Sequence, residues 1–280
     1  MLNAIFESNN GKTFNFGIQY KNAFNMDVGQ GMNTAIGTSQ SFSAVGETVE
    51  SRTISGRTIS VTGVLYGDVP SSKRIMRSIL HPLASGKLTI NGTHSANVYV
   101  LNAPSFSTAR DDGRYTMQFF APFPYFFESE EKAFSLGSWK AHFSFPVTYS
   151  STEPHSFGIK SGLANVNVYN SGEVEVPYRL LVQANGNVSS INLLNITNGK
   201  FLRLDGELDT GDTLEVYRDE NGILRAIKTV DGEKLDVLSW ISEDSNFYEL
   251  SIGDNLVSMG GESAISVFFY FAPAVWGVYE

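Results

Sequence analysis

Hydrophobic and polar residues alternate along most of the chain, which is the pattern of β-strands that bury one face. Segments with a large apolar residue at nearly every second position are 14–20, 59–65, 115–119, 176–182, 214–216 and 265–271. Asn-Gly pairs at 10, 91, 185, 198 and 221 and Asp-Gly pairs at 112, 205 and 231 accept the positive φ angles of tight hairpins. The pattern predicts a mainly β protein of antiparallel strands, with a β-sandwich in each half.

Two segments depart from this alternation. Residues 68–86 place Ile75, Ile79 and Leu83 at helical intervals, which predicts one short helix over about 71–81 that ends near Pro82. Residues 26–56 are rich in Gly, Ser and Thr and hold few large apolar side chains. They predict a long loop or a projecting hairpin.

The segment APFPYFFESEEK, at 121–132, marks a domain boundary. Pro122 and Pro124 lack the backbone N–H that a strand donates, so we expect pairing of the preceding strand to end there. The acidic residues that follow favour a solvated linker, and the division predicts two domains, 1–131 and 132–280. The sequence FFAP at 119–122 is echoed by YFAP at 270–273. The echo fits either coincidence or two domains that end alike.

The charge of the chain divides at the same place. Residues 1–131 hold ten Lys or Arg and ten Asp or Glu, whereas the remainder holds ten and nineteen, so the net charge of -9 lies in the second half. An acidic half repels phosphates, and we expect no affinity for nucleic acid. A neutral first half is suited to pack against copies of itself, because net charge opposes association.

The chain has no cysteine, which excludes disulfides and thiolate chemistry. Its first residues, MLNAIFESNN, lack a basic segment followed by an apolar one, so we expect no signal peptide and synthesis in a cytoplasm. The apolar run 264–279 contains Pro273 and lacks flanking basic residues. It predicts a strand and its exit, not a membrane span.

Groups suited to catalysis or metal binding are sparse. The histidines at 81, 94, 142 and 155 lack metal-binding spacing, and no nucleophile-elbow or dinucleotide motif occurs, so we expect no cofactor and no enzymatic activity. Asp205, Glu207, Asp209 and Asp212 offer oxygens for calcium, but Thr210 stands where an EF-hand loop needs Gly, and acids on an exposed strand explain them equally well. A glycosidase needs two carboxylates facing each other across a cleft, which spacing does not establish.

Two sets of surface residues are candidates for binding. The first set consists of basic residues of the first half, to which we assign polar contacts at the rim of a self-interface. A solvated surface explains these residues equally well, and they are Arg52, Arg57, Lys73, Arg74 and Arg77. The second set consists of the tryptophans, whose rings can stack on sugars, although tryptophan packs more commonly in a core. They are Trp139, Trp240 and Trp276.

Several segments resemble the distal tail protein family of long, non-contractile-tailed phages and prophages. In the first half these are GRTISVTGVLYGDVPSSKRIMRSILHPLASGKLTING at 56–92 and RYTMQFFAPFPYFFESE at 114–130. In the second half they are YNSGEVEVPYRLLVQANG at 169–186, YELSIGDNLVSM at 248–259 and YFAPAVWGVYE at 270–280. Together these segments cover much of the chain.

The resemblance implies a structural virion protein without enzymatic activity. Its first domain would form a homohexameric ring with an open channel at the tail tip, and its second, galectin-like sandwich would project outward. The implied partners are other copies of the chain, the tail tube, the tape-measure protein, tail-associated or tail-tip proteins and receptor-binding proteins. The residues leave one alternative open, a carbohydrate-binding β-sandwich protein that contacts host cell-wall glycans.

Overall fold

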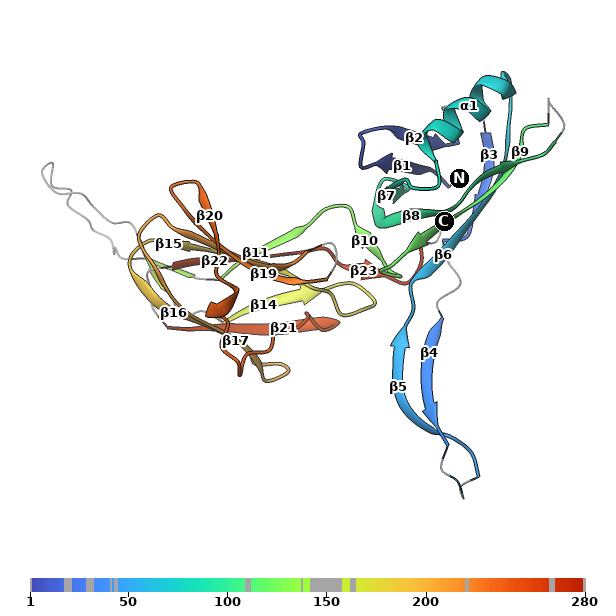
Figure 1. The fold of residues 1–280 in the computed structure, drawn as a ribbon. Coiled ribbons are helices and arrows are strands. Elements are labelled where there is room, and N and C mark those ends of the chain that lie inside the picture. Colours follow the sequence, from blue (N-terminus) through green and yellow to red (C-terminus); the bar gives the residue numbers. More distant parts are fainter. Residues whose placement is uncertain are drawn as a thin grey trace, which may run out of the picture. The chain divides into compact units, whose positions relative to one another are not determined.

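The computed structural model describes residues 2–17, 22–28, 33–40, 42, 45–108, 112–136, 138–141, 158–161, 165–219, 222–261 and 265–278. The chain divides into two compact units: unit 1 comprises Met1–Glu130 and Ala274–Glu280, and unit 2 comprises Glu131–Pro273. Both consist mainly of antiparallel strands, which confirms the predicted fold class (Figure 1). Residues 274–280 fall in unit 1, whereas the division drawn from the sequence placed them in the second domain.

Unit 1 is built on one strongly curved sheet whose hydrogen-bonded order is β2-β1-β7-β8-β9-β6-β3. Strands β10 and β23 join it through β8, and β4 and β5 form a separate two-stranded hairpin. The elements of unit 1 are β1 (Ala4–Ser8), β2 (Thr13–Phe16), β3 (Asn22–Met26), β4 (Thr34–Ser39), β5 (Thr48–Ile54), β6 (Arg57–Leu65), α1 (Val69–Ile79), β7 (Ser85–Ile90), β8 (His94–Phe106), β9 (Arg114–Ala121), β10 (Phe126–Glu128) and β23 (Ala274–Val275).

The core of unit 1 lies inside this curved sheet. Phe6 of β1 stacks on Phe119 of β9, with ring centroids 5.3 Å apart, and Phe16 of β2 meets the edge of the same ring at 6.2 Å. These rings come from strands far apart in the sheet order, so the sheet folds over on itself and buries its alternating apolar face.

Helix α1 closes this core through Met76 and Ile79. It begins two residues earlier than the sequence predicts, because Asp68 accepts a hydrogen bond from the backbone N–H of Ser71 at 3.2 Å and Pro70 is tolerated in the first turn. Within the described ranges, the helices are too short or too polar to cross a bilayer.

The proline segment ends strand β9, as the sequence predicts, but the sheet of unit 1 continues beyond it. Strand β9 ends at Ala121, just before Pro122, and pairing with β8 resumes at Phe127 in β10. Strand β22 (Ile265–Phe271) likewise ends within the echoed sequence at 270–273, and the short strand β23 follows it. Strands β10 and β23 pair with each other, with Phe126 opposite Val275, so the two echoed segments lead to adjacent strands of unit 1.

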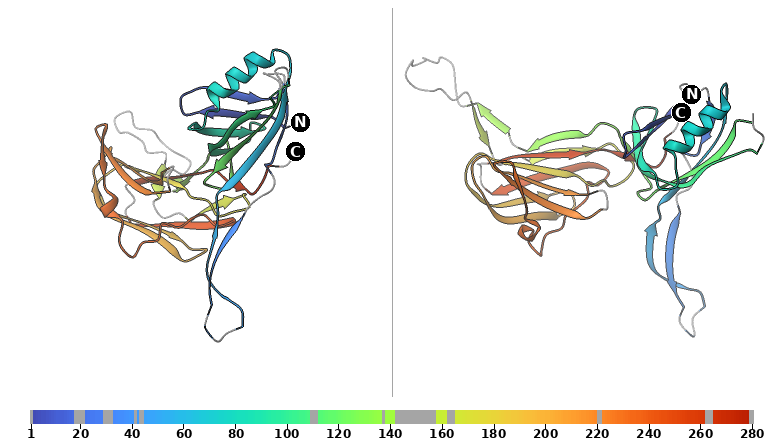
Figure 2. Two further views of the ribbon diagram at one scale, coloured as in Figure 1. Left: turned by 45° about the vertical axis from the view of Figure 1, so that its right-hand side comes forward. Right: turned by 45° about the horizontal axis from the view of Figure 1, so that its top comes forward.

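Unit 2 contains a six-stranded sheet, ordered β11-β22-β15-β18-β19-β20, and a four-stranded sheet, ordered β14-β21-β16-β17, which lie in two layers (Figure 2). Buried and exposed residues alternate along β15, β16 and β17, as in a sandwich. Its other elements are β11 (Lys132–Leu136), β12 (Ser138–Ala141), β13 (Gly158–Ser161), β14 (Asn165–Asn170), β15 (Arg179–Ala184), β16 (Val188–Asn195), β17 (Lys200–Leu208), β18 (Thr213–Arg218), β19 (Leu224–Val230), β20 (Glu233–Asp236), η2 (Leu238–Trp240) and β21 (Gly253–Gly261).

Candidate assembly surfaces

The hairpin of β4 and β5, here called the arm, runs away from the sheet of unit 1 (Figure 1). It confirms the projecting hairpin predicted for 26–56. Nearly all of its residues are exposed to solvent. An isolated two-stranded hairpin is only marginally stable in water, so the arm has the character of an element that is completed by a partner.

The two faces of the arm differ in chemistry. Ile36 lies opposite Arg52, and Thr38 lies opposite Val49, which places Ile36, Val49 and Ile54 on one face. These three side chains are 56%, 54% and 45% exposed. The other face carries the small residues Ala35, Gly37, Ser39, Thr48, Ser51 and Thr53, and Glu50 is the extra, unpaired residue at the irregularity in the register. The arm therefore exposes an apolar strip, with Arg52 as a cation within it.

Arg57 follows the arm directly but is only 2% exposed. Its guanidinium donates to the carbonyl oxygen of Val28 at 3.5 Å and to that of Trp276, and it lies over the Phe126 ring at 5.2 Å from the centroid. The prediction that Arg57 makes polar contacts at a rim is wrong, because its side chain is enclosed within unit 1. Arg57 shares strand parity with the buried Ile59 and Val61, which is the signal that indicates its inward direction.

The three basic residues of α1 lie together, away from Arg52. Lys73 and Arg77 both lie over the ring of Phe106, at 5.5 and 4.9 Å from its centroid, and Arg74 is exposed. The aromatic ring holds two like charges close to each other on one face of the helix. Of the five predicted rim residues, the structure thus gathers Lys73, Arg74 and Arg77 and separates Arg52 and Arg57.

The predicted sugar-stacking tryptophans do not form one described site. Trp240 packs against Gly206, where a β-carbon would come within 2.0 Å of the indole, and Lys228 Nζ lies 5.7 Å from the indole centroid. Trp276 belongs to unit 1, where its ring meets Tyr125. The side chain of Trp139 lies outside the described residues.

Two of the acidic residues at 205–212 pair with basic side chains. Asp205 pairs with Arg203 at 2.8 Å, and Asp212, which is buried, pairs with Lys228 at 2.7 Å. Hydrogen bonds from Lys228 and from the backbone N–H of Asp209 lower the pKa of Asp212. In the part of the chain that the structure describes, no three His, Asp or Glu side chains gather to hold a metal ion.

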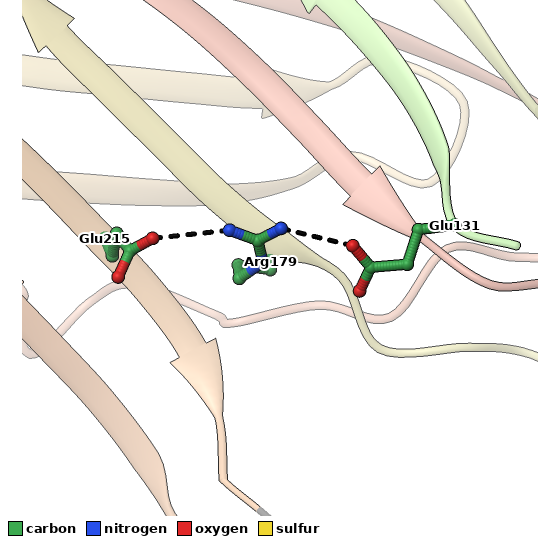
Figure 3. Close-up of polar contacts among 3 residues, drawn as sticks. All are labelled: Glu131, Arg179 and Glu215. Atoms are coloured by element: carbon green, nitrogen blue, oxygen red, sulfur yellow. Dashed lines mark hydrogen bonds and ion pairs between the residues drawn. The ribbon is translucent and has the colours of Figure 1, made fainter.

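Arg179 forms a charged group on the six-stranded sheet that the sequence patterns do not indicate. Its guanidinium bridges Glu131 at 3.1 Å and Glu215 at 3.3 Å (Figure 3). It also lies over the Tyr270 ring, 4.3 Å from the centroid. Glu131 is the first residue of unit 2 and Tyr270 lies in its last strand, so Arg179 holds both ends of that unit. A single arginine in an alternating strand gives no signal of this arrangement.

Comparison with known proteins bears on the whole chain. Residues 171–273 match the family model of the siphovirus-type tail component, C-terminal domain. The fold is similar to the crystal structure of the Dit protein of phage SPP1, with a TM-score of 0.67 and 10% identity over 96% of this chain and 98% of that chain. A chain of the phage p2 baseplate, in its activated conformation with strontium, gives a TM-score of 0.50 and 9% identity over 99% of this chain and 100% of that chain. No curated protein matches in sequence.

Proposed function

The chain belongs to the distal tail protein family of siphovirus-type tails, and from this premise we propose that it is a structural hub that forms a ring of six copies at the distal end of a phage tail. The match of residues 171–273 to the tail-component family carries this proposal. The SPP1 Dit protein, whose fold is similar over nearly the full chain, is described as a paradigm of hub adsorption apparatus in phages that infect Gram-positive bacteria. In this proposal the protein is a component of the virion and has a structural role.

Unit 1 is the ring-forming part in this proposal. Its neutral charge balance lets copies approach without repulsion, whereas the acidic unit 2 disfavours self-contact. A ring requires two different surfaces on each copy, which meet head to tail. The apolar strip of the arm supplies one of them, because Ile36, Val49 and Ile54 are exposed β-branched residues on a hairpin that extends beyond its own sheet.

Unit 2 is the outward part and attaches peripheral components. The faces of the ring contact the tail tube with its tape-measure protein on one side and the tail-associated or tail-tip protein on the other. Receptor-binding proteins attach through the outward units. The excess of negative charge keeps these units apart from one another in the ring.

Light scattering after size exclusion, together with negative-stain images, tests the ring. We expect a species of six times the chain mass and rings with an open centre. The double variant Ile36→Asp with Val49→Asp is expected to shift the protein to monomer, because two carboxylates then face the neighbour. Leu235→Asp is the matched control, since Leu235 is 51% exposed in unit 2.

A wild-type protein that remains a monomer at its highest soluble concentration contradicts ring formation by the chain alone. A ring that forms equally well with both arm substitutions places the self-contact elsewhere in unit 1. A ring that Leu235→Asp disrupts and the arm substitutions do not disrupt assigns assembly to unit 2. The three outcomes separate the ring itself from the surface that forms it.

A further inference from the structure

Four segments of unit 1 meet at the guanidinium of Arg57. Two of them flank the arm in sequence and are here called its root: Val28 follows β3, before the arm, and Arg57 begins β6, after it. The hydrogen bond from Arg57 to the carbonyl of Val28, at 3.5 Å, therefore joins the segment that precedes the arm to the segment that follows it. The backbone bond from Asp27 to Ser60, at 3.0 Å, and that from Ser55 to Asn33, at 2.9 Å, lie on either side of this point.

The other two segments, here called the connections, are the parts of unit 1 that lead into unit 2 and out of it. Strand β10, with Phe126, is the last strand before the chain enters unit 2, and β23 is the first after the chain leaves it. Arg57 contacts one residue of each connection, the ring of Phe126 and the carbonyl of Trp276. The N–H of Val278 also donates to the carbonyl of Val28, at 3.2 Å. One buried side chain thus links both connections and both segments of the arm root.

The chemistry of arginine suits this position. Its planar guanidinium presents several donors in a fixed geometry and stacks on aromatic rings, which a lysine ammonium cannot do at the same time. A cation that is only 2% exposed depends on its acceptors, because an unsatisfied buried charge is costly. Displacing Trp276 or Phe126 therefore changes the free energy of the contact between Arg57 and Val28.

We propose that Arg57 couples the arm to the two connections of unit 2, so that a displacement of either connection loosens the arm root and a fixed arm root tightens the connections. Coupling of this kind is reciprocal, because one coupling free energy describes both the effect of the connections on the arm root and the effect of the arm root on the connections. Its use in a virion rests on the proposed function: binding of a partner to unit 2 would alter the affinity of the arm for the neighbouring copy. The coupling itself is a property of the single chain.

Hydrogen exchange on the full-length chain tests this coupling. Phe126→Leu removes the ring beneath the guanidinium and keeps an apolar side chain. We expect the amides of Asp27 and Ser55, at the arm root, to exchange about tenfold faster, which corresponds to about 1.4 kcal/mol, because the change removes a buried cation–π contact. Phe123→Leu is the matched control, because Phe123 lies in the same connection, is 45% exposed and has its ring beside that of Phe127 instead.

The double variant separates coupling from general weakening. In an Arg57→Lys background, Phe126→Leu is expected to add less than about twofold to the exchange at Asp27 and Ser55, because the shared contact is already lost. A full tenfold increase in that background would overturn the proposal, and so would a tenfold increase with Phe123→Leu. Equal acceleration of the amides of β1 and α1 by Phe126→Leu would also overturn it, since it indicates a loss of overall stability. None of these readings depends on whether rings form.

Discussion

Arg57 and Arg179 hold corresponding places in the two units but act in different surroundings. Arg57 contacts Phe126, in the segment by which the chain leaves unit 1, and Trp276, in the segment by which it returns. Arg179 contacts Glu131, the first residue of unit 2, and Tyr270, in its last strand. Arg57 is enclosed and bound to neutral carbonyls. The side chain of Arg179 is 35% exposed and is bound to two carboxylates.

The difference shows how each unit depends on its chain ends. Unit 1 is discontinuous, because Ala274 and Val278 lie in its interior although they are far from the rest of it in sequence. Unit 2 is one continuous segment, and the ion pairs of Arg179 lie at its surface, where water and salt screen them. Unit 1 therefore requires its distant segment to fold stably, whereas unit 2 requires only its own residues.

The largest expected effect comes from separating the units. We expect residues 131–273 to fold alone, whereas 1–130 alone loses about 4 kcal/mol in its free energy of unfolding, since Val278 leaves the core and Arg57 loses an acceptor. Joining 274–280 to 1–130 through a flexible linker is expected to restore most of this loss. Urea unfolding followed by circular dichroism measures all three pieces. Equal stability of 1–130 with and without the added segment would remove the contrast between the units.

A substitution inside unit 2 tests whether that unit is held by its own sheets. Gly206→Ala places a β-carbon 2.0 Å from the indole of Trp240, so η2 must move away from β17. Overpacking of this kind is expected to cost about 3 kcal/mol. Gly260→Ala is the control, because its β-carbon would meet only the amide nitrogen of Asn192, at 4.0 Å. A loss confined to the unfolding transition of unit 2 agrees with independent units, and an equal loss in unit 1 does not.

The buried pair of Asp212 and Lys228 gives unit 2 an acid-sensitive contact. A lowered pKa in the folded state means that the pair stabilises unit 2 fully above the ordinary pKa of an aspartate and that this stability is lost as the pH falls through the lowered value. Asp212→Asn is expected to cost about 2 kcal/mol at pH 7 and to leave unit 2 less sensitive to pH below about 4. Asp205→Asn, in the exposed pair with Arg203, is expected to change neither the free energy of unfolding of unit 2 at pH 7 nor its dependence on pH.

Local patterns were sufficient to predict most of the fold. Alternation identifies β6, β9 and β22, the helical spacing of Ile75 and Ile79 identifies α1, and the polar composition of 26–56 identifies the arm. The return of 274–280 to unit 1 was not predictable in this way, because it depends on pairing between β10 and β23, which lie far apart in sequence. The division of charge also did not indicate that 274–280 belongs to unit 1, since Glu280 is the only charged residue in this segment.

The candidate assembly surfaces were less predictable than the fold. Helical spacing brings the three basic residues of α1 together, whereas the position of Arg57 was missed although its parity with Ile59 indicates burial. The apolar strip of the arm depends on the register between β4 and β5, with its irregularity between Gly37 and Thr38. Register of this kind is not contained in the composition of either strand.

The smallest expected effect returns to the two arginines. Arg179→Gln removes both surface ion pairs and is expected to lower the stability of unit 2 by less than about 1 kcal/mol, because the pairs are screened by solvent. In 1 M NaCl, where screening acts over about 3 Å, this difference is expected to shrink, whereas the effect of Arg57→Lys on unit 1 stays unchanged. Urea unfolding at low and high salt measures both differences. An effect of Arg179→Gln that is as large as that of Arg57→Lys and does not respond to salt would show that the ends of unit 2 are held as firmly as those of unit 1.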